Sequence, residues 1–323
     1  METINFAEIA ERLGDEDKAR ELAERLRWPS GPVCPRCGAV EAYKLTPKPT
    51  SKRPVRPGVY KCKACRRQFS VSVGTVFEDS HIPLRKWMMA IYLMCSSKKG
   101  MSAHQLHRSL GVTYRSAWFM AHRIRYAMKD KSGGPLAGML EADETYVGGK
   151  PRRHPSKRAG RSQRDIQRES YQNKVPVFGV LERGGRVRAM PIKGISKMRV
   201  IKALTENVDT ERSTLVTDES PLYGDVKVMI PHRTVKHAET YVTGDGIHTQ
   251  GIENFWSLLK RALIGTYHHV GVDYLDQYVD EAAFKYNTRK LSDGERFASA
   301  LQNSRGRLTW FFAEAQGESP AAP

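Results

Sequence analysis

The stretch Met139-Leu-Glu-Ala-Asp-Glu-Thr-Tyr-Val-Gly-Gly149 runs from apolar, β-prone residues into a group of acids around Asp143. A second apolar run ends in the same way at Asp218, in the segment STLVTDES. A third acid, Glu253, lies in HTQGIENFWSLLKR, and the three acids follow the spacing Asp-x74-Asp-x34-Glu. Acids at strand ends and on a nearby helix can converge on two divalent cations, Mg²⁺ or Mn²⁺, that activate a water or a hydroxyl for attack on a phosphodiester.

The segment around Glu253 has the apolar period of a helix from about residue 251 to 263. Its buried stripe is formed by Ile252, Trp256, Leu259 and Leu263. At about 100° per residue, Glu253 falls at the border of that stripe, and Lys260, nearly two turns on, shares its face. The pair is suited to holding a cation and a phosphate together. A solvated Glu and Lys on an ordinary helix is the alternative.

Each strand-terminal acid has acidic neighbours, so pattern alone leaves the ligand open. Asp143 lies between Glu141 and Glu144, and Asp218 precedes Glu219. Acids in these positions also serve as turn formers and helix caps.

Four cysteines form two C-x2-C pairs, Cys34–Cys37 and Cys62–Cys65. Each pair offers two thiolates from one tight turn, and two pairs complete a tetrahedral zinc site. Strand-like residues 58–61 and 68–73 flank the second pair, as in a zinc ribbon. The sequence therefore predicts structural Zn²⁺, with the fifth cysteine, Cys95, in a helical core.

Composition indicates a polyanionic partner. The 323 residues carry a formal charge of +18 with a pI near 9.7, which favours nucleic acid over a ribosome-associated or membrane-surface role. We find no apolar run long enough to span a membrane and no secretory signal, and we expect a cytoplasmic protein whose cysteines are not paired in disulfides.

Residues 84–128 predict a helical module in which one helix ends at Gly111 and a second begins near Thr113. This is the pattern of a helix-turn-helix, whose second helix can lie in the major groove. The candidate DNA contacts are Arg115, His122, Arg123 and Arg125. A plain helical packing unit is the alternative.

We therefore expect a multi-domain α/β protein. From residue 140 onward the predicted order is β-β-β-α-β-β-α, with acids on the first strand, the fourth strand and the last helix, which fits a ribonuclease-H-like core. The expected parts are N-terminal helices (1–30), a zinc ribbon (31–76), a helical DNA-binding module (77–132), the catalytic core (133–292, with a basic loop at 150–174) and a C-terminal tail (293–323).

The chain resembles the zinc-ribbon-bearing DDE insertion-sequence transposases of bacteria, the ISXO-like group, over most of its length. The matching stretches are RWPSGPVCPRCG, CKACRRQFSVSVGTVFEDS, WFMAHRIRYAM, DETYVGGK, TDES, HTQGIENFWSLLKR and GTYHHV. The resemblance implies metal-binding acids at Asp143, Asp218 and Glu253 and a base- or phosphate-contacting Lys260. Family members vary at the third acid, so Gln250 and Asn254 stay open as ligands.

The resemblance also implies strand cleavage and strand transfer at the ends of an insertion sequence. The expected partners are double-stranded DNA, both terminal inverted repeats and target, and further copies of the chain. A zinc-ribbon DNA-binding regulator and a structure-specific nuclease on the same fold are the alternatives. His237, His248, His268 and His269 lie near the expected site, with roles in the site, the core or DNA-backbone contact left open.

Overall fold

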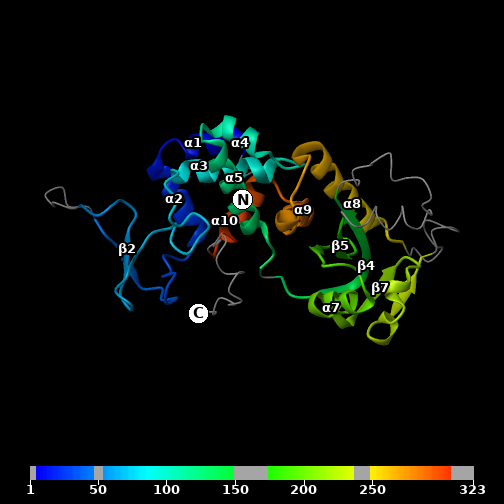
Figure 1. Cartoon of the computed structure of the whole chain (residues 1–323). Coiled ribbons are helices and arrows are strands. Elements are labelled where there is room, and N and C mark those ends of the chain that lie inside the picture. The colour runs from blue at the N-terminus through cyan, green and yellow to red at the C-terminus, as the bar shows by residue number, and fades with distance from the viewer. Residues whose placement is uncertain (1–4, 47–53, 132, 149–173, 236–247, 307–323) are drawn as a thin grey trace. The chain divides into compact units, whose positions relative to one another are not determined.

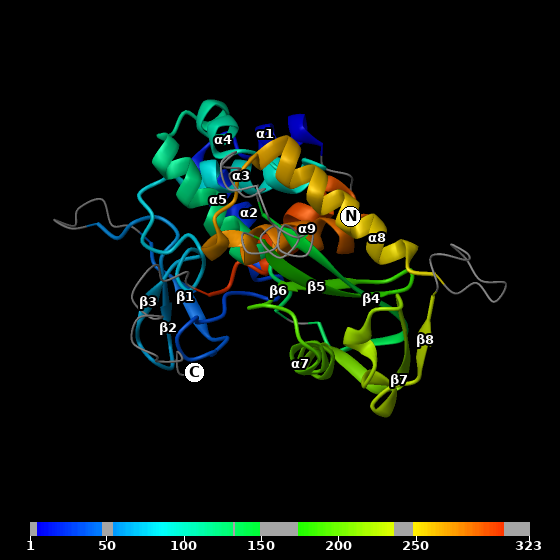
Figure 2. The same cartoon turned by 45° about the vertical axis from the view of Figure 1, so that its right-hand side comes forward.

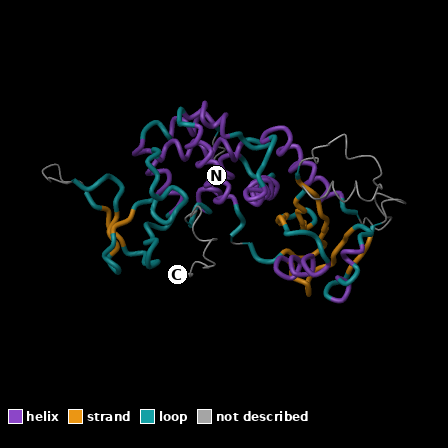
Figure 3. The backbone as a smooth tube through the Cα atoms, viewed as in Figure 1, coloured by secondary structure: helices purple, strands orange, loops and turns teal. Residues whose placement is uncertain are grey.

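A computed structural model of the chain separates it into two compact units (Figures 1 and 3). Unit 1 comprises residues 1–129 and 290–323, and unit 2 comprises residues 130–289. The chain thus leaves unit 1, forms unit 2, and then returns. The structure describes residues 5–46, 54–131, 133–148, 174–235 and 248–306.

Unit 1 begins with two short helices, α1 (Phe6–Arg12) and α2 (Glu16–Arg27), as the sequence predicts. The Asp15 side chain caps α2 by accepting a hydrogen bond from the Lys18 N–H at 2.7 Å. A capping carboxylate satisfies one of the free N–H groups of a first helical turn. The apolar residues Ile9, Leu13 and Leu22 are buried, which fixes these helices to the rest of unit 1.

A small antiparallel sheet follows, formed by β1 (Ala42–Lys44), β2 (Tyr60–Cys62) and β3 (Gln68–Phe69) in that order (Figure 2). Trp28, Tyr60 and Phe69 pack as an aromatic cluster with ring centroids 5.5–5.8 Å apart. Arg27 donates hydrogen bonds to the carbonyls of Val71 and Val73. The sheet is therefore anchored to the end of α2 rather than standing alone.

The helices α3 (Leu84–Ser96), α4 (Ala103–Leu110) and α5 (Tyr114–Met128) form the rest of unit 1. Ser102 caps α4, Gly111 ends it in a left-handed conformation with φ 57°, and Thr113 caps α5. Glycine suits this position because a side chain is disfavoured there. The predicted helix, turn and helix are all present.

The predicted C-terminal tail opens with a helix, α10 (Asp293–Gln302), which packs mainly against α3. Ser292 and Glu295 form a reciprocal capping box at its start. This Ser-x-x-Glu pattern is a recognised signal for a helix start, so residues 293–302 were open to prediction as a helix. Their buried residues Phe297 and Leu301 belong to the core of unit 1.

Unit 2 is built on a five-stranded mixed sheet with the order β6-β5-β4-β7-β8 (Figure 2). Strands β4, β5 and β6 are antiparallel neighbours, whereas β7 and β8 run parallel to β4. Their bounds are β4 (Leu136–Val147), β5 (Val175–Glu182), β6 (Val187–Pro191), β7 (Val208–Thr217) and β8 (His232–Thr234).

Helices cover both faces of this sheet (Figures 1 and 2). On one face α7 (Lys197–Asn207) packs against a core that includes Leu140, Phe178 and Val180. On the other face α8 (Gln250–Ala262) and α9 (Leu275–Asn287) pack against Val177 and Leu181. Successive residues of β5 therefore serve opposite cores, as a strand buried on both faces requires. The order of strands and helices agrees with the predicted one.

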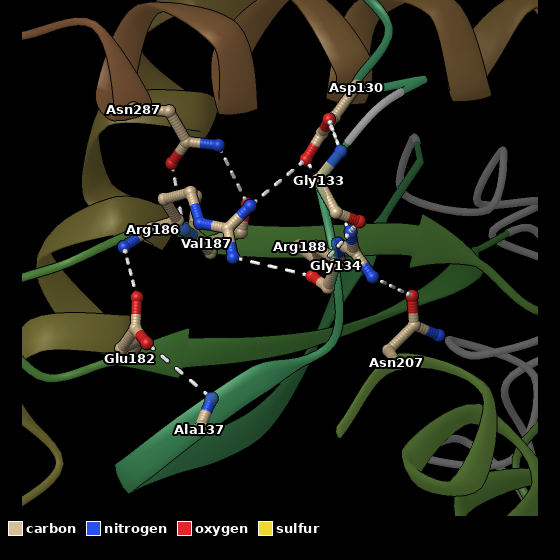
Figure 4. A network of polar contacts seen from close by, with 10 residues as sticks. All are labelled: Asp130, Gly133, Gly134, Ala137, Glu182, Arg186, Val187, Arg188, Asn207 and Asn287. Carbon is tan, nitrogen blue, oxygen red and sulfur yellow. Dashed lines mark hydrogen bonds and ion pairs between the residues drawn. The ribbon is translucent and has the colours of Figure 1, made fainter. Parts of the chain in front are cut away.

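A polar network fixes the segment through which the chain enters unit 2 (Figure 4). Guanidinium nitrogens of Arg186 and Arg188 lie 3.8 and 3.6 Å from Asp130 Oδ2. Arg186 also donates a hydrogen bond to the Gly134 carbonyl, and Arg188 donates to the carbonyls of Gly133 and Gly134. Asn287 both accepts from the Val187 N–H and donates to the Val187 carbonyl, at 2.7 and 3.0 Å. The edge strand β6 thus holds the entering segment and the end of α9.

Candidate functional site

The four cysteines of unit 1 lie together, as their spacing predicts. The Sγ atoms of Cys34 and Cys65 are 3.7 Å apart, those of Cys37 and Cys62 are 3.6 Å apart, and all four lie within 4.8 Å of one another. Tetrahedral zinc with Zn–S bonds of about 2.3 Å places its sulfur ligands about 3.8 Å apart. The cluster therefore fits one structural Zn²⁺. Cys95 is buried in α3, as expected of a core residue.

In unit 2, sheet register brings Asp143 and Asp218 to the same edge. The parallel strands β4 and β7 pair Glu141 with Val216, and two residues further on lie Asp143, inside β4, and Asp218, just past the end of β7. The prediction that Asp143 ends its strand is therefore wrong, since β4 continues to Val147 and pairs there with β5. Neighbouring strands are about 4.8 Å apart. The electrostatic effect of Asp218 on the pKa of Asp143 reflects this proximity.

The alternation of β4 separates Asp143 from its acidic neighbours. Glu144 points to the α7 side, where its Oε2 accepts a hydrogen bond of 2.7 Å from the buried Tyr223 hydroxyl. Glu141 points to the α8 side with Asp143 but is fully buried. Asp143 is thus the residue of the three that combines the α8 face with partial exposure at the edge of the sheet.

Burial raises the pKa of Asp143 to about 6, with Glu144 and Asp218 adding to the rise and hydrogen bonds opposing it. One of these bonds comes from the Trp256 indole N–H, 3.0 Å from Asp143 Oδ2. Gly179, the β5 partner of Asp143, makes room for that indole, because a Cβ there would lie 2.7 Å from the Trp256 ring. The site therefore contains a desolvated carboxylate surrounded by like charge, an arrangement that a cation stabilises.

Asp218 is held at the end of β7 by its own turn. Its Oδ1 accepts from the Ser220 N–H at 3.0 Å. Beside it, Thr217 Oγ1 contacts His232 Nε2 at 2.9 Å, and burial lowers the pKa of that imidazole. The Asp218 side chain itself is partly exposed, so it remains open toward the edge.

Glu253 occupies the first turn of α8 and is exposed, and its Oε1 accepts from the Thr249 hydroxyl at 2.8 Å. Lys260, Gln250 and Asn254 are also exposed on α8. Within the described ranges, the four cysteines form a group of metal-ligating atoms within 4.8 Å, and the three acids do not. The structure thus brings Asp143 and Asp218 to one edge and leaves Glu253 turned toward its own helix end.

The histidines of the predicted site have different surroundings. His248 lies at the start of α8 with its Nδ1 3.4 Å from Glu141 Oε1. His268, with φ 59°, and His269 are exposed in the turn after the π-helical residues Leu263–Tyr267. His237 lies outside the described residues, as do residues 150–173 of the predicted basic loop.

The predicted DNA contacts on α5 also differ from one another. Arg115 is exposed at the start of the helix. Arg123 is bound to the carbonyls of Val76 and Glu78 at 2.9 and 3.1 Å. Arg125 is 2% exposed and His122 is 1% exposed. The sequence placed these two on a DNA-facing surface, but both are buried within unit 1, where α3, α4 and α10 pack against α5.

Several residues around the acids have roles that were not predicted: Glu141 was considered only as an alternative ligand, and Gly179, Arg183, Tyr223 and Trp256 were not predicted as parts of the site. Trp256 was recognised as part of the apolar stripe of α8, and the polar end of a buried indole usually has a partner. That rule predicts that the Trp256 indole N–H donates a hydrogen bond, but it does not identify Asp143 as the acceptor. The other four depend on sheet register and helix docking.

Comparison with known proteins gives the class of the chain. Residues 135–287 match the ISXO2-like transposase domain, and residues 14–68 match the transposase zinc-ribbon domain. An uncharacterized protein in transposable element ISH50 of Halobacterium salinarum is 32% identical over 273 residues, which cover 82% of this chain and 88% of that protein. The chain belongs to the ISXO2-like transposase family, and the resemblance seen in the sequence is confirmed.

Across the described residues, none of the helices has the length and apolar character needed to cross a membrane.

Proposed function

We propose that the chain is a DDE-type DNA transposase that cuts DNA at the ends of an insertion sequence and joins those ends to target DNA. The observation that carries the proposal is the β4–β7 register, which brings Asp143 beside Asp218 at the point where β7 ends. The matched transposase domain covers both acids and Glu253.

The sheet supports a ribonuclease-H-like core. Its first three strands are antiparallel neighbours, and the fourth lies parallel to the first, on the side away from the second. A ribonuclease-H-like core has this order, and the two strand-borne acids then come from its first and fourth strands. The helix that follows, α8, supplies Glu253.

Asp143 and Asp218 would hold divalent cations, because carboxylate oxygens are the preferred ligands of Mg²⁺. Glu253 is the third ligand in this proposal, and to bind a cation it would exchange its hydrogen bond to Thr249 for the metal. Two such cations, when bound, lower the pKa of the attacking water or 3′-hydroxyl and stabilise the leaving oxygen. Lys260, exposed two turns beyond Glu253, would hold a phosphate of the DNA end.

DNA binding is assigned to unit 1 in this proposal. The α4–Gly111–α5 segment has the form of a helix-turn-helix with Arg115 exposed at the start of its second helix. The ribbon adds the exposed side chains of Lys63, Arg66 and Arg67. Such positive charge binds the phosphates of terminal repeats and target DNA, on which several copies of the chain would assemble.

The test is a cleavage and strand-transfer assay on DNA carrying the element ends, with Mg²⁺ or Mn²⁺. Asp143→Asn and Asp218→Asn should each reduce both reactions by about 10³-fold or more while end binding persists, since electrostatic stabilisation of the reacting phosphate is lost. Asp225→Asn is the matched control, because Asp225 is exposed on unit 2 and pairs with Lys197. Undiminished transfer by the Asp143→Asn, Asp218→Asn double variant contradicts the proposal.

The same assay separates the two alternatives. A DNA-binding regulator would bind the ends without cutting them at any metal concentration. A structure-specific nuclease would cut DNA but would not join a 3′-end to a target.

A further inference from the structure

Glu141 is a buried acid that the proposed chemistry does not use. It lies on β4, two residues before Asp143 and on the same face, and its side chain has no exposed surface. A carboxylate in this position is costly unless charge and hydrogen bonds compensate it. Its partners therefore indicate what it does.

Both carboxylate oxygens of Glu141 are bound to the region where α8 begins. Oε2 accepts a hydrogen bond of 3.0 Å from the Ile252 N–H. Oε1 accepts from Arg183 Nε at 3.1 Å and lies 3.4 Å from His248 Nδ1. Arg183 also donates through Nη2 to the His248 carbonyl at 2.9 Å. Glu141 and Arg183 thus hold together β4, the end of β5 and the start of α8.

Two features of α8 fit this contact. The N-cap residue Thr249 makes no side-chain capping hydrogen bond to the helix, so Glu141 supplies from another element the acceptor that a cap normally provides. Gly251 lets the carboxylate approach, because a Cβ there would lie 2.7 Å from Glu141 Oε2. A negative charge at this end also interacts favourably with the helix dipole.

The contact between Glu141 and α8 has the same spacing along the sheet and the helix as the contact between Asp143 and α8. Residues 141 and 143 are about 6.6 Å apart along a strand, and residues 252 and 256 are about 6 Å apart along a helix. Glu141 binds the Ile252 N–H, and Asp143 binds the Trp256 indole one turn later. Two successive carboxylates on one face of β4 therefore hold two successive turns of α8.

We propose that Glu141 and Arg183 are positioning residues that set the position of α8 along β4, and thereby place the Trp256 indole on Asp143 and fix the helix turn that carries Glu253. The part of this inference that concerns activity rests on the proposed transposase function. The part that concerns α8 and Asp143 rests on the contacts alone.

The test separates positioning from mere stabilisation. Arg183→Met leaves the buried Glu141 charge without its main partner and should lower the Tm, whereas the Glu141→Gln, Arg183→Met double variant removes both charges and should recover most of the Tm. In the double variant we expect peptides covering residues 250–258 to exchange amide hydrogens about 10-fold faster and Mn²⁺ to bind about 10-fold more weakly. Cleavage of the element end should fall about 10-fold at subsaturating Mn²⁺ and recover in part at saturation.

The matched control is the Glu281→Gln, Lys285→Met double variant, which removes another buried ion pair of unit 2. In that pair, Lys285 Nζ lies 2.6 Å from Glu281 Oε1, and both residues belong to α9. This control should keep wild-type exchange in α8 and wild-type Mn²⁺ affinity. A double variant at 141 and 183 that recovers the Tm together with wild-type exchange and Mn²⁺ affinity overturns the inference, since the ion pair would then only stabilise the fold.

Failure of the proposed function gives a different result. If the wild-type protein binds Mn²⁺ without cutting the DNA, the transposase proposal fails, while Mn²⁺ affinity and exchange in α8 still decide the role of Glu141. If Mn²⁺ does not bind, exchange in α8 decides it, and exchange at the wild-type rate contradicts the inference.

Discussion

The four cysteines of unit 1 and the three acids of unit 2 are two candidate sets of metal ligands, and they are assembled in different ways. Each cysteine pair spans four residues of one tight turn, and the four sulfur atoms lie within 4.8 Å. The acids come from two strands and a helix spread over more than a hundred residues. Their arrangement depends on the β4–β7 register and on how α8 packs against the sheet.

The two sets of side chains also differ in the groups that they contact. The cysteine sulfur atoms face one another. The acids are instead bound to protein groups, Asp143 to the Trp256 indole, Asp218 to the Ser220 amide and Glu253 to the Thr249 hydroxyl. Repulsion between carboxylates is part of the reason that the pKa of Asp143 is raised. A local motif can thus encode a whole site, whereas a dispersed set needs supporting contacts that the motif does not show.

The largest expected effect concerns the local site. Cys62→Ser should reduce bound zinc from about one per chain to none and unfold the ribbon, because structural zinc contributes roughly 10 kcal/mol or more to such a module. Elemental analysis and proteolysis of residues 31–76 measure the two effects. Cys95→Ala is the control, since Cys95 is buried in α3 away from the cluster and its loss should leave the zinc in place.

The next prediction concerns the stability of the dispersed site. Without added divalent cations, Asp143→Asn should stabilise unit 2 by about 1–3 kcal/mol at neutral pH, because a rise of about two pKa units corresponds to roughly 3 kcal/mol before solvent screening. In the folded protein the pKa of Asp143 is about 6, so the carboxyl group keeps its proton until the pH approaches that value. Wild-type stability should therefore fall as the pH rises from about 4 to 6, and the advantage of the variant should grow over that interval. Denaturant unfolding at pH 4, 6 and 8 measures it, and a constant difference contradicts the prediction.

A smaller effect tests the contact that orients Asp143. Trp256→Phe removes the indole N–H and keeps most of the packing, so Mn²⁺ affinity should fall about 10-fold, in line with the loss of one hydrogen bond to a charged group. Trp87→Phe is the matched control, because Trp87 is also buried and donates its indole N–H to Ser80 at 2.9 Å in unit 1. Titration calorimetry measures the Mn²⁺ affinity of both variants. An equal loss of affinity in the two would show that Trp256 has no specific role in metal binding.

The smallest effect compares two helix caps. Ser292→Ala removes the capping hydroxyl of α10 and should cost unit 1 about 1 kcal/mol, and Ser196→Ala should cost unit 2 a similar amount at α7. Hydrogen exchange assigns each loss to its unit. Faster exchange of residues 293–302 in the Ser292→Ala variant, with α7 unchanged, is the expected result.

Many helices and strands could be predicted from residues that lie close together in the sequence. Gly111 and Thr113 were predicted as the end of one helix and the start of the next from neighbours a few residues away, and both helices are present. Apolar runs likewise located the strands of unit 2, whereas in the ribbon β1 was not predicted and the strand predicted over residues 68–73 is limited to Gln68–Phe69. The cysteine site, which is also local in each half, was predicted with all four of its ligands.

Contacts between distant elements were not predictable in this way. The helix that carries the buried Arg125, α5, packs against α10, which lies more than 160 residues further along the chain. The interactions of Glu141 depend on where α8 lies along β4, and residue pattern alone left Glu141, Asp143 and Glu144 equivalent. Their different roles follow from strand alternation combined with the packing of α7 and α8 on opposite faces.

The return of the chain to unit 1 through α10 has a consequence for synthesis on the ribosome. Domains generally fold as units as the chain emerges, N-terminal parts first. Here α3 lacks its α10 partner until residue 302 has been made, so residues 130–289 emerge before unit 1 can close its core. A chain that stops before residue 293 would contain Asp143, Asp218 and Glu253 but would lack α10, so unit 1 would be missing one of the helices that form its core.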